Sequence, residues 1–361
     1  MPRVIGIDPG TVSFDLCGLD DGRVFLDTSI PTADALADPA LIAALINDAP
    51  PIDLVAGPSG YGLPLKNLRD VTETELRLAC LAPRGESGGV GGLAALMRAL
   101  APVAATVVVT PGVVQLPTVP AHRKINRVDM GTADKVCAVA LAIHERSRRL
   151  GSRGGDSFVL VELGGAFTAA IAVESGCIVD GLGGSSGALG ATASGALDGE
   201  VAFLAQEVTK QMIFSGGALA VAGTPGAHAE DIADTSTERR RTAFEGYLES
   251  IVKAIAALRV SAPAARDVVL SGRVAGVRRV REALATRVRR VWPDAAVDAL
   301  SGFATTSKHA AQGAALLADG LAGGPAAALV ERLGIRAASG TVLDHLYVIS
   351  SEAARRRLGI I

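Results

Sequence analysis

The sequence predicts an α/β protein of two domains. The chain has 361 residues, more than a single core of typical size would use. An apolar strand, a glycine turn and two further short strands occur at 3–27 and again at 157–180. Helical patterns follow each copy, so we expect two modules of one kind, at 1–150 and 151–323, and a tail at 324–361 with no assigned role.

The first module begins with an apolar strand at 3–8 and a Pro9-Gly10-Thr11 turn. Strands at 14–19 and 23–27 flank Asp20-Asp21-Gly22, and Asp-Gly between apolar runs favours a hairpin. The elements expected next are a helix at 38–46, a strand at 52–56, a helix at 91–100, a strand at 105–109 and a long helix at 132–150 capped by Thr132.

The second module repeats this opening with strands at 157–163, 167–173 and 177–179. A glycine- and serine-rich stretch at 181–195 follows it. The remaining elements are expected to be helices at 197–210 and 237–259, a strand at 267–270, a basic helix at 277–291, a short strand at 296–297 and an alanine-rich helix at 308–321.

Composition and charge exclude several classes of function. The formal net charge of -2 gives no global attraction to nucleic acid or to an anionic membrane. The four cysteines are scattered without a CxxC pair, which argues against a disulfide framework, a zinc site or a cysteine-ligated cluster. The uncharged stretch at 99–121 contains four prolines and is therefore no spanning helix. A predicted strand already begins at residue 3, in place of the apolar helix of a signal peptide. We therefore expect no signal peptide and a cytoplasmic protein.

Two acidic glycine turns occupy equivalent places in the two modules. In Asp8-Pro9-Gly10-Thr11 the carboxylate can hold a metal-bound water, while Gly10 and Thr11 can cradle phosphate oxygens. In the second module Glu162 precedes Gly164, Gly165 and Thr168. Either turn alone is also compatible with an ordinary hairpin. Facing each other, the two turns could bracket a triphosphate, with Asp8 and Glu162 as candidate catalytic and Mg²⁺-binding groups.

A third element runs from a strand through Ser271, Gly272 and Arg273 to Gly276. Backbone at such a turn can lie flat against a purine, and the Arg273 guanidinium could stack on it. A routine strand-to-helix turn is the alternative. The small residues of the helix at 308–321 permit close packing against another helix.

These elements, in this order, resemble the superfamily of acetate and sugar kinases, heat-shock chaperones and actin. The stretches 6–11, 57–64, 123–135 and the helix ending at Gly323 resemble a group of predicted butyrate-kinase-like proteins. The resemblance implies two ribonuclease-H-like (actin-like ATPase) domains, ATP and Mg²⁺ in an interdomain cleft, and a last helix that closes the second domain. Asp8 stands where acetate and butyrate kinases usually have Asn, Glu162 where Asp is usual, and Arg273 where a second glycine is usual.

A basic segment precedes the long helix of the first module. Its Arg123 and Arg127 could hold the charge of an acyl-phosphate transition state, and Asp129 could orient a nucleophile or a second cation. Ser59 and Tyr61, in a glycine-rich loop, could touch the acceptor. A solvated basic loop and a structural glycine loop are the alternatives.

The function that we predict is phosphoryl transfer from ATP to a small-molecule acceptor, such as a short carboxylate. The alternative is an ATP-driven activator or chaperone-like ATPase that uses the same cleft. The opening turn also resembles that of Holliday-junction resolvases, but the neutral charge argues against a nuclease. No pair of the five histidines has the His-x-x-x-His spacing that threonylcarbamoyl transfer needs. A homodimer is compatible with the sequence.

Overall fold

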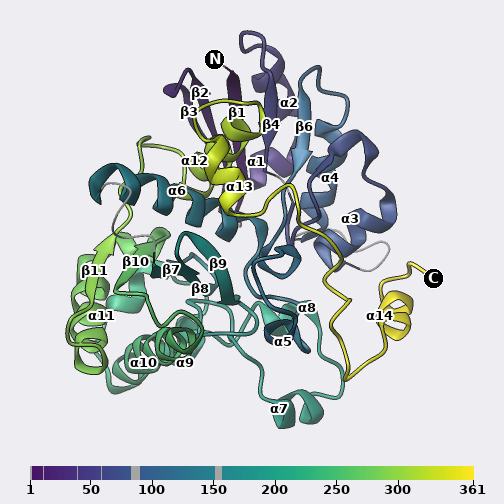
Figure 1. Ribbon diagram of the computed structural model, residues 1–361. Helices are drawn as coiled ribbons and strands as arrows, with labels where there is room; N and C mark the ends of the chain where they lie inside the picture. Colours follow the sequence, from purple (N-terminus) through teal and green to yellow (C-terminus); the bar gives the residue numbers. More distant parts are fainter. Residues whose placement is uncertain (1, 11, 39, 58, 83–89, 151–156) are drawn as a thin grey trace.

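The computed structural model describes residues 2–361 except 11, 39, 58, 83–89 and 151–156. Its first sheet has the strand order β3-β2-β1-β4-β6-β5 (Figure 1). Strands β1 to β3 form an antiparallel meander, and β4 and β6 continue the sheet parallel to β1. The strands are β1 (Arg3–Pro9), β2 (Ser13–Asp20), β3 (Arg23–Pro31), β4 (Leu54–Ala56), β5 (Lys66–Asn67) and β6 (Thr106–Val109).

The second sheet has the order β11-β10-β7-β8-β9, which is the order of the first sheet without β5. Its strands are β7 (Phe158–Leu163), β8 (Thr168–Glu174), β9 (Cys177–Leu182), β10 (Asp267–Ser271) and β11 (Ala296–Ala299). Again three antiparallel strands precede two parallel ones. The predicted repeat of the meander is therefore confirmed, and with it the two-domain α/β fold.

Helices cover the outer faces of both sheets and fill the space between them (Figure 1). Alternate residues of β7 show why: Phe158 and Leu160 join the central core, while Val159 and Val161 join the core of the outer face. The outer helices are α1 (Thr32–Ala37), α2 (Ala40–Asn47), α3 (Glu73–Cys80) and α4 (Val90–Leu100) on the first sheet, and α9 (Ala218–Ala222), α10 (Glu238–Ser261) and α11 (Arg278–Val291) on the second.

Helices α6 (Ala133–Leu150) and α12 (His309–Leu321) pack together, and while α12 lies against β1, β2 and β4 of the first sheet, α6 contacts β7 and β8 of the second. A Cβ added to Gly6 of β1 would lie 2.1 Å from Ala315 N, and one on Gly313 would lie 1.8 Å from Cys137 O. Both glycines therefore let α12 approach β1 and α6 closely. The close helix packing is confirmed, but the expectation that this helix closes the second module is wrong.

The 324–361 tail crosses back over the first module. Helix α13 (Ala327–Arg332) packs on α12, and the side chains of Val342, Leu343 and Leu358 are buried in the central core. Near the chain end, Arg77 of α3 donates a hydrogen bond to Gly359 O at 2.5 Å. The tail, which had no expected role, thus straps the first module, and its last helix is α14 (Ser351–Arg357).

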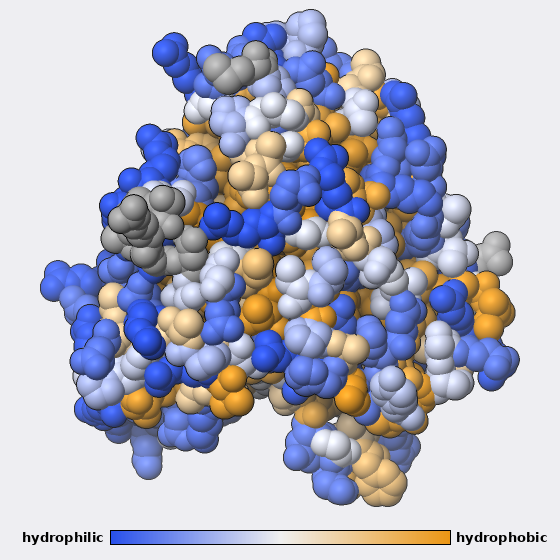
Figure 2. Space-filling model, in the orientation of Figure 1, coloured by the Kyte–Doolittle hydropathy of each residue, from blue (hydrophilic) through white to orange (hydrophobic). Residues whose placement is uncertain are grey.

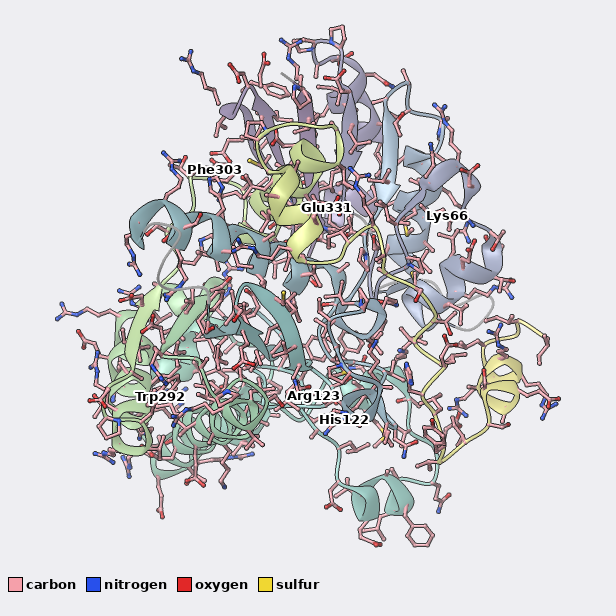
Figure 3. The ribbon with its side chains drawn as sticks, viewed as in Figure 1. Lys66, His122, Arg123, Trp292, Phe303 and Glu331 are labelled. Carbon is pink, nitrogen blue, oxygen red and sulfur yellow. The ribbon has the colours of Figure 1, made fainter. Side chains whose placement is uncertain are left out.

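Short helices lie at the lower centre of the molecule in Figure 1, beside the long helices of the second sheet. The helix expected at 197–210 is instead two, α7 (Gly199–Leu204) and α8 (Lys210–Ile213), because Gln206 between them has a φ of 61°. Helix α7 forms a knob that projects from the molecule (Figure 2). Figure 3 shows His122 and Arg123 on α5 (Ala121–Lys124). The short 3₁₀ helices are η1 (Leu68–Asp70), η2 (Val113–Gln115), η3 (Ala229–Ala233) and η4 (Arg273–Gly276). Among the described helices, none combines the length and hydropathy of a membrane-spanning segment.

Candidate nucleotide site

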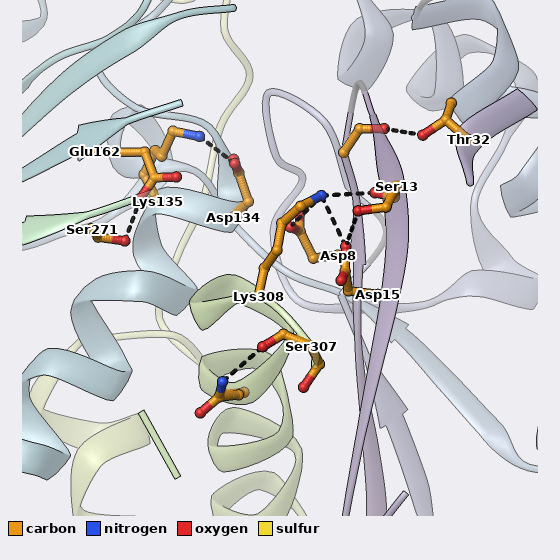
Figure 4. A network of polar contacts seen from close by, with 12 residues as sticks. Asp8, Ser13, Asp15, Thr32, Asp134, Lys135, Glu162, Ser271, Ser307 and Lys308 are labelled. Carbon is orange, nitrogen blue, oxygen red and sulfur yellow. Dashed lines mark hydrogen bonds and ion pairs between the residues drawn. The ribbon is translucent and has the colours of Figure 1, made fainter. Parts of the chain in front are cut away.

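The first acidic turn contains two carboxylates. Asp8 ends the apolar part of β1 and pairs in register with Asp15 of β2, so both side chains lie on one face of the sheet. Both are buried, and Lys308, just before α12, separates their charges (Figure 4). Its Nζ lies 2.8 Å from Asp15 Oδ2 and 3.9 Å from Asp8 Oδ2, and it donates to Ser13 O at 2.8 Å.

Burial raises the pKa of Asp8 to about 7, although the Lys308 ammonium opposes the shift. The neighbouring carboxylates of Asp134 and Asp15 raise it further, while Lys135 lowers it. The ionised carboxylate therefore lacks sufficient positive charge around it. A cation placed beside Asp8 would stabilise its charged form.

The second acidic turn is tied to two other elements. Glu162 of β7 accepts a hydrogen bond from Ser271 Oγ at 2.5 Å, across the parallel pairing of β7 with β10. Ser271 Oγ also lies 3.2 Å from Nδ1 of His309, the first residue of α12. Residues 308 and 309 thus contact the acidic groups of the first sheet and the Ser271 hydroxyl of the second.

The first turn of α6 places a third group of charges between the two sheets. Lys135 contacts the Asp134 carboxylate (Figure 4). The Thr132 hydroxyl contacts the same carboxylate. Burial alone would lower the pKa of Lys135, but the charges of Asp134, Glu162 and Asp8 outweigh it and hold that pKa above its usual range. One partly buried ammonium group is therefore within electrostatic reach of acids from both modules.

The two glycine turns also lie next to each other. A Cβ added to Gly165 would be 3.6 Å from the Val12 side chain of the first turn. A Cβ on Gly10 would be 2.3 Å from Lys308 Nζ, so this glycine makes room for the lysine. The Gly10 N–H donates to Ser13 O at 3.0 Å and the Gly164 N–H to Phe167 O at 3.0 Å. These two amides close their own hairpins, and the binding of phosphate by Gly10 stays a prediction.

The charges suit a hydrated divalent cation. Four carboxylates and two lysines meet here, an excess of two negative charges when all are ionised. Within the described ranges, no group of three or more His, Cys, Asp or Glu side chains is arranged to hold a metal ion directly. Mg²⁺ usually keeps several waters and takes one or two protein carboxylates. Asp8 and Glu162 therefore fit Mg²⁺ through water rather than as a complete protein cage.

The candidate purine turn follows directly on Glu162's partner Ser271. Gly272 has a φ of 88°, and a Cβ on it would lie 2.6 Å from Leu163 O, so only glycine fits beside the second turn. Arg273 donates to Glu230 at 2.5 Å, so an ion pair already engages the guanidinium that was expected to stack on adenine. The buried Ser271 hydroxyl donates its hydrogen bond to Glu162. A Cβ added to Gly276 would have no neighbour within 4 Å.

Two predicted site residues are buried elsewhere. Thr168 begins β8 with its side chain inside the second module, next to the hydroxyl of buried Tyr247. Ser59 is also buried, where its Oγ accepts from Thr110 N at 2.6 Å. The Ser59 hydroxyl therefore connects the loop after β4 to the end of β6. The contacts of Thr168 with phosphate and of Ser59 with the acceptor stay predictions, and Thr11 lies outside the described residues.

The basic segment meets the glycine- and serine-rich loop of the second module. Asp129 is buried and accepts hydrogen bonds from Ser185 N and Ser185 Oγ, both at 2.9 Å. A Cβ on Gly183 would lie 1.8 Å from Asp129 Oδ1. Asp129 thus fixes the loop by hydrogen bonds, and its predicted role in orienting a nucleophile or a second cation stays a prediction. Arg127 donates to Ser186 O at 3.4 Å.

Tyr61 belongs to the same cluster. Burial and the Asp129 carboxylate raise the pKa of Tyr61, and a hydrogen bond with Ser185 opposes them. The Lys210 ammonium lies 5.5 Å from the centre of the Tyr61 ring. Arg123, in contrast, donates to Val179 O at 2.8 Å and is directed to β9. The structure therefore groups Tyr61, Arg127 and Asp129, but not Arg123.

This cluster adjoins the second phosphate turn. A Cβ on Gly184 would lie 2.6 Å from the Phe167 side chain, and Phe167 stands two residues after Gly165. Phe167 packs edge-on against Phe214 with ring centres 4.9 Å apart. The loop that Asp129 fixes therefore contacts Phe167, at the end of the turn that follows Glu162.

Five residues of the site were not predicted as site residues. Two sequence signals could have revealed some of them: Asp15 is an acid inside an otherwise apolar strand, and Lys308 precedes a helix rich in alanine and glycine. The unpredicted residues are Asp15, Asp134, Lys135, Lys308 and His309.

The two equivalent sheets, the α6–α12 pair between them and the facing acidic turns define the fold of the acetate and sugar kinase, heat-shock chaperone and actin superfamily. The chain belongs to the family described as "Protein of unknown function (DUF1464)", whose model matches residues 6–348. A search of the curated proteins finds no match.

Three solved structures share the fold at low sequence identity. A propionate kinase from Francisella tularensis has a TM-score of 0.62 and 11% identity, and the match covers 87% of this chain and 99% of that one. An acetate kinase from Entamoeba histolytica has a TM-score of 0.58 and 14% identity, covering 80% and 87%. An acetate kinase from Porphyromonas gingivalis has a TM-score of 0.54 and 16% identity, covering 87% and 98%.

Proposed function

We propose that the protein is an ATP-dependent phosphotransferase that binds Mg²⁺ and ATP between the two acidic turns and phosphorylates a small acceptor, plausibly a short carboxylate. The observation that carries this proposal is the position of Lys135, whose ammonium group interacts with Asp134, Glu162 and Asp8 at once. A cation in that position, with glycine turns on both sides, suits a polyphosphate. The similarity to acetate and propionate kinases supports the carboxylate.

Each group has a separate part in this proposal. Lys135 and Lys308 hold phosphate oxygens and balance the carboxylates around them. Asp8 and Glu162 hold water molecules of the hydrated Mg²⁺, and Ser271 orients the Glu162 carboxylate. When bound, Mg²⁺ supplies positive charge between the phosphate oxygens. The glycine at position 272 leaves flat backbone for the purine.

The acceptor is placed by the Tyr61–Arg127 cluster. Arg127 presents a planar, permanently charged guanidinium on the side of the loop that adjoins the second turn. A carboxylate acceptor and a phosphoryl group in transit both carry negative charge, so one arginine can stabilise both. Asp129 acts indirectly, because its hydrogen bonds to Ser185 fix the loop that faces Arg127.

An ADP-release assay tests this function. The purified protein is incubated with Mg²⁺ and ATP, alone and with a panel of short carboxylates and sugars, and the Lys135→Met variant serves as a comparison. We expect ADP formation that one short carboxylate stimulates and that Lys135→Met abolishes. Stimulation by a sugar would show that the acceptor is a sugar and not a carboxylate. Slow hydrolysis that no acceptor changes would instead favour the ATP-driven activator or chaperone-like ATPase.

A further inference from the structure

Helix α7 does not pack its apolar side chains against the rest of the chain. None of its residues is buried, and the side chains of Phe203 and Leu204 are 77% and 75% exposed. Val201, on the same helix, is 48% exposed. Large apolar side chains that gather on a projecting helix indicate a surface that another molecule covers (Figure 2).

The charges around these side chains have one sign. We call residues 198–207 the acidic knob, since the segment contains Asp198, Glu200 and Glu207 and no lysine or arginine. Asp198 caps the helix by accepting from Glu200 N at 2.9 Å. The acidic groups thus surround an apolar centre, the arrangement of a protein–protein contact with a polar rim.

A second exposed apolar surface lies beside the knob. Tyr347, Val348 and Ile349 are 73%, 81% and 50% exposed. Asn126 holds them in place, because its Oδ1 accepts from Tyr347 N at 2.7 Å and from Val348 N at 3.0 Å. This extended run therefore has a fixed conformation even though its side chains contact solvent.

The second surface carries the opposite charge. We call residues 345–358 the basic strap: it contains Arg355, Arg356 and Arg357 and one acid, Glu352. Arg357 lies 3.6 Å from Glu207 of the knob and donates to Val208 O at 3.4 Å. The acidic knob and the basic strap are therefore neighbours on one face of the same chain.

We propose that this face is a homodimer interface, in which the acidic knob of each copy packs on the basic strap of the other. A face that carries both an acidic and a basic segment can bind a second copy of itself, because each segment meets the opposite one. A two-fold interface requires such self-complementarity. Phe203 and Tyr347 are the large aromatic anchors that such interfaces use at their centre. The opposite charges of knob and strap favour this pairing over knob against knob.

Sedimentation velocity on the full chain tests the proposal. We expect the wild-type protein to be a dimer at about 10 µM, and Phe203→Asp with Leu204→Asp to raise the dimer dissociation constant about 100-fold or more. Because α7 buries no side chain, the variant should still fold, and its far-UV circular dichroism spectrum should equal that of the wild type. Val260→Asp, at a site that is 84% exposed on α10, is the matched control and should stay dimeric.

A complementary pair of charge reversals then tests the arrangement. One variant carries Glu200→Lys and Glu207→Lys in the knob, and the other carries Arg356→Glu and Arg357→Glu in the strap. Each alone should be monomeric, because like charges would face each other in both contacts. Mixed in equal amounts they should form a heterodimer, because both contacts then join opposite charges. A monomeric wild type, charge variants that remain dimers alone, or a mixture that does not associate would each overturn the proposal.

Discussion

Replacing Lys308 by methionine removes the cation that separates two buried carboxylates. Asp15 is 1% exposed and lies 2.8 Å from the ammonium, and Asp8 is 6% exposed and lies 3.9 Å away. Removing one partner of a fully buried ion pair costs about 3–5 kcal/mol. The Lys308 side chain is 40% exposed, so water offsets part of this cost, and we expect the free energy of unfolding to fall by about 2 kcal/mol at about pH 8.

The loss should depend on pH in a defined direction. Burial raises the pKa of Asp8 from 3.8 to about 7, so the folded protein binds a proton that the unfolded chain releases. Stability contributed by that proton is present at low pH and is lost as the pH rises to about 7. Without Lys308 the folded pKa of Asp8 rises further, because the opposing positive charge is gone. The difference between variant and wild type should therefore be largest at alkaline pH and should shrink below about pH 6.

Urea unfolding at several pH values in metal-free buffer measures this difference. Lys253→Met is the matched control, because Lys253 pairs with Glu249 on the exposed surface of α10 and its loss should change stability by less than about 0.5 kcal/mol. Asp15→Asn in the Lys308→Met background should restore part of the stability. The reasoning would be refuted if Lys308→Met lost no more stability than the control, or lost the same amount at every pH.

Three further predictions concern the loop before α12, the α12 contact and the transfer step. Burial would raise the pKa of Asp27, but hydrogen bonds from the 305–307 backbone outweigh it and hold that pKa well below its usual range. Asp27→Asn should therefore lower the melting temperature at neutral pH, and the difference should vanish as acid protonates Asp27. Gly6→Ala should cost about 3 kcal/mol or prevent folding, whereas Gly226→Ala, with open space around it, should be neutral in urea unfolding. Arg127→Ala should lower kcat roughly 100-fold with little change in ATP affinity by calorimetry, and unchanged kcat would exclude a role in transfer.

The fold could be predicted because its signals are local. Strands around Asp20-Asp21-Gly22 and Glu174-Ser175-Gly176 form hairpins whose turn residues determine the pairing, and both turns are present as predicted. The partner of α12 could not be predicted in this way. Small residues show that a helix packs closely, but the sequence does not say against which sheet; the missing side chain of Gly6 decides this in three dimensions.

The site was predictable only where an acid ends an apolar strand before glycines. Asp8 and Glu162 meet this condition, and the structure places both between the sheets. Lys308 hydrogen bonds to Ser13 across 295 residues, and no local pattern indicates such a contact. In the sequence Asp134 is an acid in the first turn of a helix. The helix dipole stabilises negative charge there, so an acid at this position does not by itself indicate a site. Ser59 and Thr168 were predicted as site residues because they lie beside glycine turns. The structure buries both side chains, and the Ser59 hydroxyl accepts from the Thr110 backbone, a contact that no local pattern indicates.

The central claim is that nucleotide binds between the two acidic turns. The most direct test is a crystal structure of the protein with Mg²⁺ and a non-hydrolysable ATP analogue. We expect the phosphates between Gly10 and Gly165, in contact with Lys135, and the purine against the backbone of Gly272. An analogue bound at any other place, or crystals that exclude it at concentrations well above a typical dissociation constant for ATP, would contradict the account.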